Sequence, residues 1–186
     1  MYFQKSEVTG KTALVTGAGK GIGKATAIAL AEAGADLIIL SRTKSDLEKV
    51  KKKIIKIKRK CLIYDCDISN FEELKLVFNQ ITKLDILVNN AGTNRPDQFT
   101  KIKKEDMNYV VDLNLKAAFH VAQMGAKAMI KLKNRKSVGG SIINISSQLG
   151  KVGAPNRSIY NMTKFGIEGL TRGMALDLAK NNIRVN

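Results

Sequence analysis

Short apolar runs alternate with amphipathic segments along the whole chain, and this alternation limits the fold more than any other feature. The runs lie at residues 12–16, 36–40, 61–64, 85–89 and 141–145, and another begins at 183. Segments with helical periodicity separate them at residues 21–33, from 45 onward, at 69–81, at 105–131 with a bend, and at 158–180. Strands that are apolar throughout are typical of a parallel sheet covered by helices on both faces. We therefore expect a single α/β domain over residues 1–186.

Local signals indicate where several of these helices begin and end. Capping boxes at Ser45-x-x-Glu48 and Ser69-x-x-Glu72 predict two helix starts. Gly34 is expected to end the first helix in a left-handed conformation. The basic stretch at residues 133–140 is expected to be a surface connection.

The chain is strongly basic, with a net charge of +16. Lysine outnumbers arginine 25 to 7, whereas base recognition in nucleic acids favours arginine. Leu47, Val50, Ile54 and Ile57 recur at helical spacing through the densest lysine run. That pattern predicts an amphipathic helix with a solvated lysine face, with a phosphate-attracting surface as the alternative. We expect no nucleic-acid partner.

Cysteine usage and hydropathy indicate a cytoplasmic protein without a structural metal. Cys61 and Cys66 are the only cysteines, and their odd spacing in a strand places them on opposite faces. They are therefore not expected to form a disulfide, as in a reducing compartment. No apolar run approaches the ~20 residues of a membrane span, so no membrane partner is expected.

A glycine-rich turn follows the first apolar run and opens the first helix. Its sequence is Gly17-Ala18-Gly19-Lys20-Gly21-Ile22-Gly23. Glycines let the backbone approach a pyrophosphate closely, and the helix N-terminus supplies free amide donors and a positive dipole. A strand–turn–helix with this composition predicts dinucleotide binding.

The residues after the second strand indicate which dinucleotide is bound. A site for NAD usually carries an acidic residue there for the ribose 2′-hydroxyl, but this chain has Ser41-Arg42. Lys20 adds a cation within the glycine turn. Because charge-assisted contacts to an anion are strong, the 2′-phosphate of NADP(H) is expected over NAD(H).

Tyr160 and Lys164 form a pair suited to acid–base chemistry. Residues four apart on a helix project from the same face. The pKa of a free tyrosine is near ~10, and a neighbouring ammonium lowers it toward a range usable at neutral pH. Ser147 lies thirteen residues upstream of Tyr160.

Together these motifs resemble the short-chain dehydrogenase/reductase family. The resemblance rests on Thr16-Gly17-x3-Gly21-Ile22-Gly23, Asn89-Asn90-Ala91-Gly92, Leu113-Asn114-Leu115, Ser147 and Tyr160-x3-Lys164, in the family's order and spacing. It implies a Rossmann-type doubly wound fold and an NADP-dependent oxidoreductase.

The resemblance also implies roles for individual residues. Tyr160 would be the general acid, Lys164 would hold the nicotinamide ribose and support Tyr160, and Ser147 rather than Ser146 would bind the substrate oxygen. Asn114 would support a water chain that returns protons. The remaining cofactor contacts would come from Asp67 and Ile68 beside the adenine, from Arg42 at the 2′-phosphate, and from Asn90, Ala91 and Gly92 along the cleft. Asn90 has a second interpretation, as a purely structural bridge between strands.

The chain ends at Arg184-Val185-Asn186, where members of this family usually continue. They have a Pro-Gly turn, a substrate-covering loop and a seventh strand beyond this point. The resemblance therefore implies a domain that lacks the last part of strand six and all of strand seven. We expect such a chain to be aggregation-prone or inactive.

The favoured function is NADPH-dependent reduction of a ketone to a secondary alcohol, with 3-oxoacyl carrier-protein reductase as the leading candidate. Basic residues at 127, 131, 133 and 135 would attract an acidic carrier protein, although a solvated helix end explains them equally well. A sugar, polyol or gluconate-type dehydrogenase is the close alternative. An inactive fragment and a basic binding module are alternatives of another class. The resemblance suggests dimers or tetramers built on the helices around 115–131 and 158–180.

Overall fold

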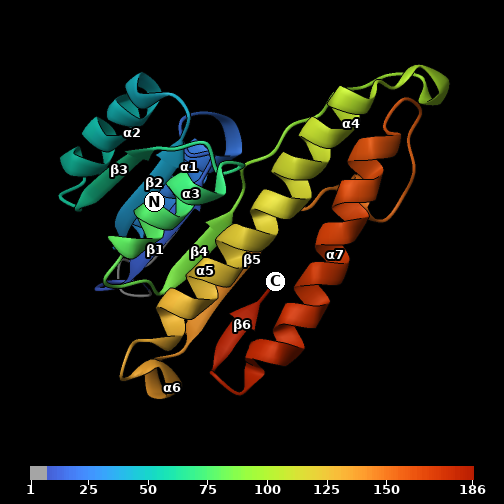
Figure 1. Ribbon diagram of the computed structural model, residues 1–186. Helices are drawn as coiled ribbons and strands as arrows, with labels where there is room; N and C mark the ends of the chain where they lie inside the picture. The colour runs from blue at the N-terminus through green and yellow to red at the C-terminus, as the bar shows by residue number, and fades with distance from the viewer. Residues whose placement is uncertain (1–7) are drawn as a thin grey trace.

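The computed structural model describes residues 8–186 (Figure 1), so the first seven residues of the predicted domain lie outside the described part. Strands and helices alternate as predicted, and most observed boundaries fall within one or two residues of the expected ones. In chain order the elements are β1 (Thr12–Thr16), α1 (Gly21–Glu32), β2 (Asp36–Ser41), α2 (Lys44–Lys56), β3 (Cys61–Asp65), α3 (Phe71–Asn79), β4 (Ile86–Asn89), η1 (Phe99–Lys101), α4 (Lys104–Val111), η2 (Asp112–Ala117), α5 (Ala118–Ile130), α6 (Arg135–Val138), β5 (Gly140–Asn144), η3 (Gln148–Gly150), α7 (Ser158–Ala179) and β6 (Ile183–Val185).

The strands form one parallel sheet in the order β3-β2-β1-β4-β5-β6. β1 lies between β2 and β4, and Val15 pairs with Ile39 on one side and with Val88 on the other. The chain winds outward from β1 toward β3 and then outward from β4 toward β6, so the strand order reverses between β1 and β4. Ligands bind at such a switch point, beyond the carboxyl ends of the strands. The predicted doubly wound Rossmann-type fold is confirmed.

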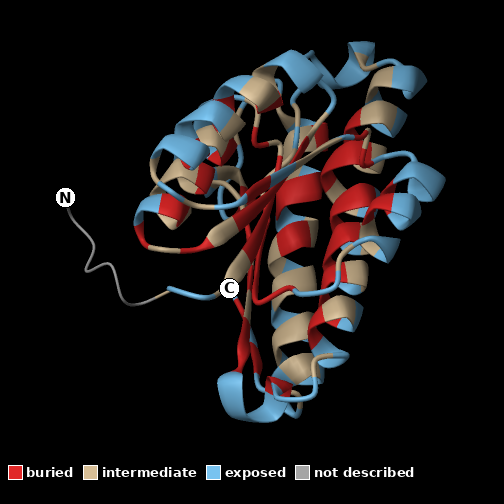
Figure 2. Cartoon of the chain, turned by 90° about the vertical axis from the view of Figure 1, so that its left-hand side faces the viewer, coloured by how far each residue is buried: buried red, intermediate tan, exposed pale blue. Residues whose placement is uncertain are grey.

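Helices cover both faces of the sheet and bury two separate apolar clusters. On one face, Ala27 of α1 and Leu47 of α2 pack against Val15 and Ile39. On the other face, α3, α5 and α7 cover Leu14 and the other residues of the larger cluster. Figure 2 shows the buried residues gathered along the sheet, with exposed residues on the outer sides of the helices. Burial on both faces explains why the strands are apolar throughout.

The lysine-rich helix α2 has the predicted amphipathic character. Its apolar residues Leu47, Val50 and Ile54 are fully buried, while most of its lysines face solvent. The capping box predicted at Ser45 is wrong, because the helix begins at Lys44 after the N-cap Thr43. Gly34 has φ 107°, in the left-handed range expected of the residue that ends α1. Within residues 8–186, no helix combines the length and hydropathy that a membrane crossing requires.

Helix α3 begins one residue later than its sequence pattern predicts. Asn70 is the N-cap, and its side chain accepts hydrogen bonds from the backbone N–H groups of Glu72 and Glu73. The Asn70 amide in turn donates to the Glu73 carboxylate at 2.8 Å. Ser69 is unavailable as a cap because its N–H and hydroxyl both donate to Asp67.

The bend predicted within residues 105–131 is a π-helical segment. α4 ends at Val111, η2 follows over Asp112–Ala117, and α5 continues the same rod. A π-turn adds a residue to the helical repeat and often lies at a functional site. Here it contains Asn114, which is buried.

The stretch at 133–140 is not a plain surface loop. It contains the short helix α6, and Arg135 at its start is only 3% exposed. The Arg135 guanidinium donates to the Asp85 carboxylate at 3.1 Å and to the carbonyls of Leu84 and Met129. The prediction that Arg135 helps attract a carrier protein is therefore wrong, because this side chain is enclosed at the amino end of β4.

Neither cysteine forms a disulfide within residues 8–186. Cys61 at the start of β3 and Cys66 just after it belong to the clusters on opposite faces, as their spacing predicts. Burial raises the pKa of Cys61 to about 12 and that of Cys66 to about 11. Both side chains are thus neutral thiols at physiological pH.

Candidate active site

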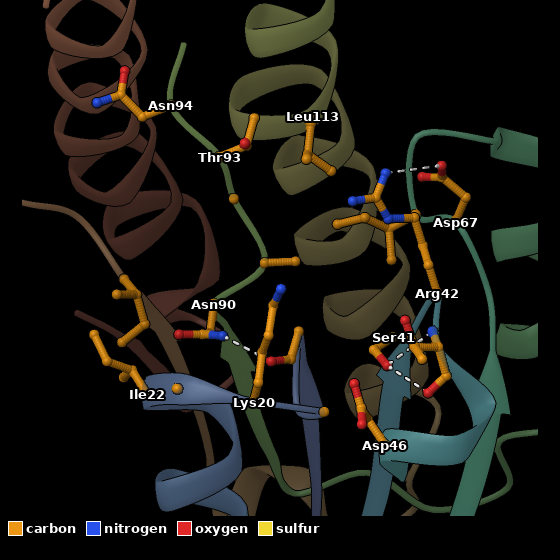
Figure 3. A pocket seen from close by; sticks show the side chains of 18 of the residues that line it. Lys20, Ile22, Ser41, Arg42, Asp46, Asp67, Asn90, Thr93, Asn94 and Leu113 are labelled. Atoms are coloured by element: carbon orange, nitrogen blue, oxygen red, sulfur yellow. Dashed lines mark hydrogen bonds and ion pairs between the residues drawn. The ribbon is translucent and has the colours of Figure 1, made fainter. Parts of the chain in front are cut away.

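A cavity of about 580 Å³ lies at the carboxyl ends of the strands. The glycine turn, the segments that follow β2, β3, β4 and β5, and α7 all contribute to its walls (Figure 3). Its volume lies within the range of small-molecule and cofactor sites. Residues that are widely separated in the chain meet here because parallel strands all end at the same edge.

The backbone of the glycine turn leaves room for a dinucleotide. Gly17 has φ 65°, a conformation that side chains disfavour. A Cβ on Gly23 would lie 2.4 Å from the Gly17 carbonyl oxygen, so only glycine allows the helix to begin this close to the turn. Gly21 and Ile22 open α1 at the cavity wall, where free amides and the helix dipole favour an anion. The site therefore fits a pyrophosphate.

Two cations line the cavity, one on the glycine turn and one at the end of β2. Lys20 extends from the glycine turn, and Arg42 extends from the end of β2 toward Asp67 (Figure 3). The Arg42 Nη1 donates to the Tyr109 hydroxyl at 3.0 Å and lies 3.9 Å from the Asp67 carboxylate. The bond to Tyr109 raises the pKa of the guanidinium above its usual value. Ser41, also in the wall, accepts a hydrogen bond from the Thr43 N–H.

Asp67 and Ile68 form the neighbouring wall after β3. Two donors from Ser69, its N–H at 3.0 Å and its hydroxyl at 2.7 Å, hold one oxygen of the Asp67 carboxylate. Ile68 is buried and packs into the larger core cluster. The residues predicted beside an adenine thus combine a fixed acceptor with an apolar surface.

Asn90, Ala91 and Gly92 line the cleft after β4, as expected. The Asn90 side chain donates to the Thr16 carbonyl at 2.9 Å, and the backbone N–H groups of Asn90 and Ala91 both donate to the Thr16 hydroxyl at 3.0 Å. Asn90 therefore bridges β1 and β4, as the structural interpretation supposes, while it also forms part of the cavity wall.

Tyr160 and Lys164 project from α7 into the cavity. The Lys164 ammonium lies 5.6 Å from the centre of the Tyr160 ring and donates to the Ile145 carbonyl at 2.6 Å. Lys164 is only 6% exposed, and this burial lowers the pKa of its ammonium. The two predicted partners are therefore close together, with Lys164 buried and Tyr160 partly exposed.

Asn114 connects three segments behind the cavity. Its side-chain oxygen accepts from the Thr93 N–H at 2.7 Å, and its amide donates to the Thr93 carbonyl at 2.8 Å and to the Thr163 hydroxyl at 3.3 Å. These bonds join η2 to the segment after β4 and to α7. The predicted role of Asn114 in a water chain stays a prediction.

The two adjacent serines after β5 lie in different surroundings. Ser147 is the N-cap of η3, where its hydroxyl oxygen accepts from the Leu149 N–H at 3.1 Å. Ser146 lines the cavity, and its buried hydroxyl finds no hydrogen-bond partner among the described residues. The preference for Ser147 as the substrate-binding residue stays a prediction.

The cavity wall also contains residues that sequence reasoning did not select. They follow the ends of β2, β3, β4 and β5 or lie on α2 or η2, and they are Thr43, Asp46, Cys66, Thr93, Asn94, Leu113 and Ile145. Their place after predicted strands is the only signal in the sequence that could have identified most of them.

Known proteins are similar to this chain in sequence and in fold. The sequence model of the short chain dehydrogenase family matches residues 11–186. A 3-oxoacyl-[acyl-carrier-protein] reductase from Thermotoga maritima is 38% identical over 181 residues, which cover 95% of this chain and 72% of that protein.

Two solved structures are also similar. An NAD+-bound xylitol dehydrogenase is 35% identical with a TM-score of 0.89, and the match covers 97% of this chain and 69% of that one. A gluconate 5-dehydrogenase from Burkholderia cenocepacia, in complex with NADP and tartrate, is 31% identical with a TM-score of 0.88, and the match covers 96% and 69%.

Proposed function

Since the chain belongs to the short-chain dehydrogenase family, we propose that it is an NADPH-dependent carbonyl reductase. The reaction would transfer hydride between the nicotinamide and a ketone or secondary alcohol. The observation that carries this proposal is the Tyr160–Lys164 pair, which shares one cavity with the glycine turn and with Lys20 and Arg42. A proton donor and an anion-binding turn are thus within reach of one extended cofactor.

The two cations support NADPH over NADH. Lys20 and Arg42 both line the cavity, and the glycine turn comes close to the end of β2, since a Cβ on Gly19 would lie 2.9 Å from the Ser41 hydroxyl oxygen. The adenosine ribose would lie beside this point. Asp46 is an acidic residue in the same wall, but Lys49 pairs with it at 3.1 Å. Asp67 is a second carboxylate in this wall, so the three cations Lys20, Arg42 and Lys49 face two carboxylates. A 2′-phosphate would therefore meet a surface that keeps a small positive excess.

The protein's own groups would handle the proton and the developing charge. A bound nicotinamide supplies the hydride. The Tyr160 hydroxyl would donate its proton to the substrate oxygen as that oxygen gains charge. The Lys164 ammonium, held by Ile145, would stabilise the negative charge left on the tyrosine oxygen. Ser147 would position the substrate oxygen. Asn114 would hold the segment at Thr93 in a fixed position relative to α7.

A 3-oxoacyl group carried on an acyl carrier protein is the substrate we favour. The Thermotoga maritima relative, a 3-oxoacyl-[acyl-carrier-protein] reductase, supports this choice. Lys127, Lys131 and Lys133 are exposed at the end of α5, where they could attract an acidic carrier. A polyol or gluconate substrate is the second candidate, supported by the similarity to the xylitol and gluconate dehydrogenase structures.

We also propose that copies of the chain associate through α5 and α7. Phe119 on α5 and Phe165 and Leu176 on α7 are 44%, 50% and 82% exposed. Large apolar side chains exposed together often mark a protein interface. Both helices cover the same face of the sheet (Figure 1), and α7 contacts α4 and η2, which form the start of the rod that α5 continues.

The catalytic assignment is tested by Tyr160→Phe, with Tyr64→Phe in β3 as a matched control. Ketone reduction is followed through the loss of NADPH absorbance, and NADPH binding through the quenching of its fluorescence. We expect Tyr160→Phe to reduce the rate by about 100-fold or more, because general acid catalysis is lost, while NADPH still binds. Tyr64→Phe should behave like wild type. An unchanged rate in Tyr160→Phe would contradict the assignment.

Cofactor preference and the alternative functions can be separated by thermal denaturation. NADPH should raise the Tm more than NADH at equal concentration, because a ligand that binds the folded state stabilises it. A protein that binds NADPH but reduces no carbonyl compound would support the inactive-fragment alternative. Salt-sensitive RNA binding without any nucleotide effect would support the basic binding module instead.

A further inference from the structure

We propose that Tyr109 is a positioning residue for cofactor specificity, holding Arg42 where it can bind the 2′-phosphate of NADPH. This inference rests on the proposed preference for NADPH. Tyr109 lies on α4, 67 residues after Arg42 and outside the motifs that identify the site. It touches Arg42 rather than the cavity, so its effect on the cofactor would be exerted through that guanidinium.

Arg42 depends on partners to hold one conformation. Its side chain is 56% exposed, and a long exposed side chain loses considerable rotamer freedom when it binds a ligand. The 3.0 Å bond to the Tyr109 hydroxyl uses Nη1 only. Nε and Nη2 have no hydrogen-bond partner among residues 8–186, so both can donate to a phosphate. The bond thus restrains the guanidinium and leaves most of its donors free.

Tyr109 is itself firmly held. Its ring packs against the larger core cluster, and the Arg95 guanidinium lies 4.1 Å from the ring centre. Arg95 also pairs with Asp106, which lies three residues before Tyr109 on α4. A cation over an aromatic face is attractive, and here an ion pair to the same helix keeps that cation in place. The hydroxyl that Arg42 meets therefore has a defined position.

The neutral phenol is better suited to this task than a carboxylate. It accepts a hydrogen bond from Arg42 without cancelling the guanidinium charge, whereas a carboxylate at hydrogen-bond distance would compete with the phosphate for it. Asp67 is the nearby carboxylate, but it lies at 3.9 Å, and Ser69 occupies its other oxygen. The arrangement orients Arg42 while leaving its charge available for an incoming anion.

The test compares two nucleotides that differ only in the 2′-phosphate, adenosine 2′,5′-bisphosphate and adenosine 5′-monophosphate. Both are titrated calorimetrically into wild type, Tyr109→Phe, Arg42→Met and the double variant. Tyr109→Phe keeps the ring beneath Arg95 and removes only the hydroxyl. We expect it to weaken the bisphosphate by about threefold to tenfold, the effect of one hydrogen bond, and to leave the monophosphate unchanged.

The double variant separates positioning from a general structural effect. With Arg42 replaced by Met, the further change Tyr109→Phe should have no effect on either nucleotide, because its partner is gone. Tyr64→Phe controls for the loss of a tyrosine hydroxyl elsewhere. The inference is overturned if Tyr109→Phe binds the bisphosphate as tightly as wild type or more tightly, or if it weakens both nucleotides equally.

The same titrations give a different set of results if the proposed preference for NADPH is wrong. In that case wild type would bind the two nucleotides equally, and Arg42→Met would change neither affinity. If instead Arg42→Met removes the preference and Tyr109→Phe retains it in full, the NADPH assignment stands and only the role of Tyr109 is refuted.

Discussion

The sheet has one edge where its parallel strands begin and one where they end, and each of these edges carries an Arg–Asp pair. One pair is buried and the other is exposed. At the amino ends of the strands, Arg135 and Asp85 are 3.1 Å apart, with side chains 4% and 6% exposed. At the carboxyl ends, Arg42 and Asp67 are 3.9 Å apart, with side chains 56% and 36% exposed. The same residue types therefore meet in a buried contact at one edge and at an open cavity at the other.

The partners of each pair show what the difference means. Arg135 donates to two backbone carbonyls besides Asp85, and Asp85 also accepts from the Thr12 N–H at 3.0 Å. That network ties β1, β4 and α6 together, and its burial keeps it from a ligand even though the Arg135 Nη1 has no hydrogen-bond partner among the described residues. Arg42 keeps free donors beside the cavity. The buried charges at the amino ends of the strands stabilise the fold, whereas the exposed charges at the carboxyl ends can bind a ligand.

The same substitution at both edges should have very different effects on stability. Arg135→Met should lower the free energy of unfolding by about 3–5 kcal/mol, because it leaves Asp85 buried without its main partner. Arg42→Met should change it by less than about 1 kcal/mol, since exposed pairs contribute little. Urea denaturation measures both values. Similar losses in the two variants would show that the edges do not differ as the structure indicates.

Two glycine substitutions should have opposite effects on stability, one at the cavity edge and one on α7. Gly23→Ala should destabilise the chain by about 1–3 kcal/mol through overpacking, because the new Cβ would lie 2.4 Å from the Gly17 carbonyl oxygen. It should also weaken NADPH binding by disturbing the turn. Gly173→Ala on α7 meets nothing within 4 Å, so it should stabilise the chain by about 0.5–1 kcal/mol. Thermal denaturation and NADPH titration give the two readouts, and normal NADPH binding by Gly23→Ala would argue against a pyrophosphate at this turn.

The smallest expected effect is on the chemical labelling of the two cysteines. Cys61 is the first residue of β3, and Cys66 follows its carboxyl end. Cys66 lines the cavity and Cys61 does not. We expect both thiols to react slowly at neutral pH, since burial raises their pKa values to about 11 and about 12. NADPH should slow the labelling of Cys66 more than that of Cys61, as measured by mass spectrometry of a time course. Equal protection of the two cysteines would indicate global stabilisation alone.

The same pKa shifts give a pH dependence with a defined sign. The folded chain holds both thiol protons more tightly than the unfolded chain, whose thiols titrate near 9.0. The contribution of these groups to stability is therefore fully present below that pH and is lost as the pH rises toward 11 and 12. Urea denaturation across this range, with Cys61→Ser and Cys66→Ser as controls, measures the change. A stability that rises over this interval in wild type but not in the variants would contradict the assignment.

Much of the site was predictable because it depends on short stretches of chain. The glycine turn follows β1 directly, and Tyr160 and Lys164 share a face of α7 through helical spacing alone. Placing such stretches at the carboxyl ends of parallel strands brings them to one cavity without further information. The π-turn was less accessible, since a sequence pattern shows a bend but not the bonds from Asn114 to Thr93 that accompany it.

By itself, the sequence determined the alternation of strands and helices, the covered parallel sheet and the positions of the main cofactor and acid–base motifs. These depend on periodicity and on residues close together in the chain. Which charged side chains are buried in ion pairs and which remain open to a ligand depends on the packing of distant segments. Arg135 lies in a basic stretch whose composition predicts a surface position. In the structure it is buried and donates a hydrogen bond to Asp85, 50 residues earlier in the chain. Arg42 meets Tyr109 across 67 residues. Such pairings arise from the packing of distant elements, which no local pattern encodes.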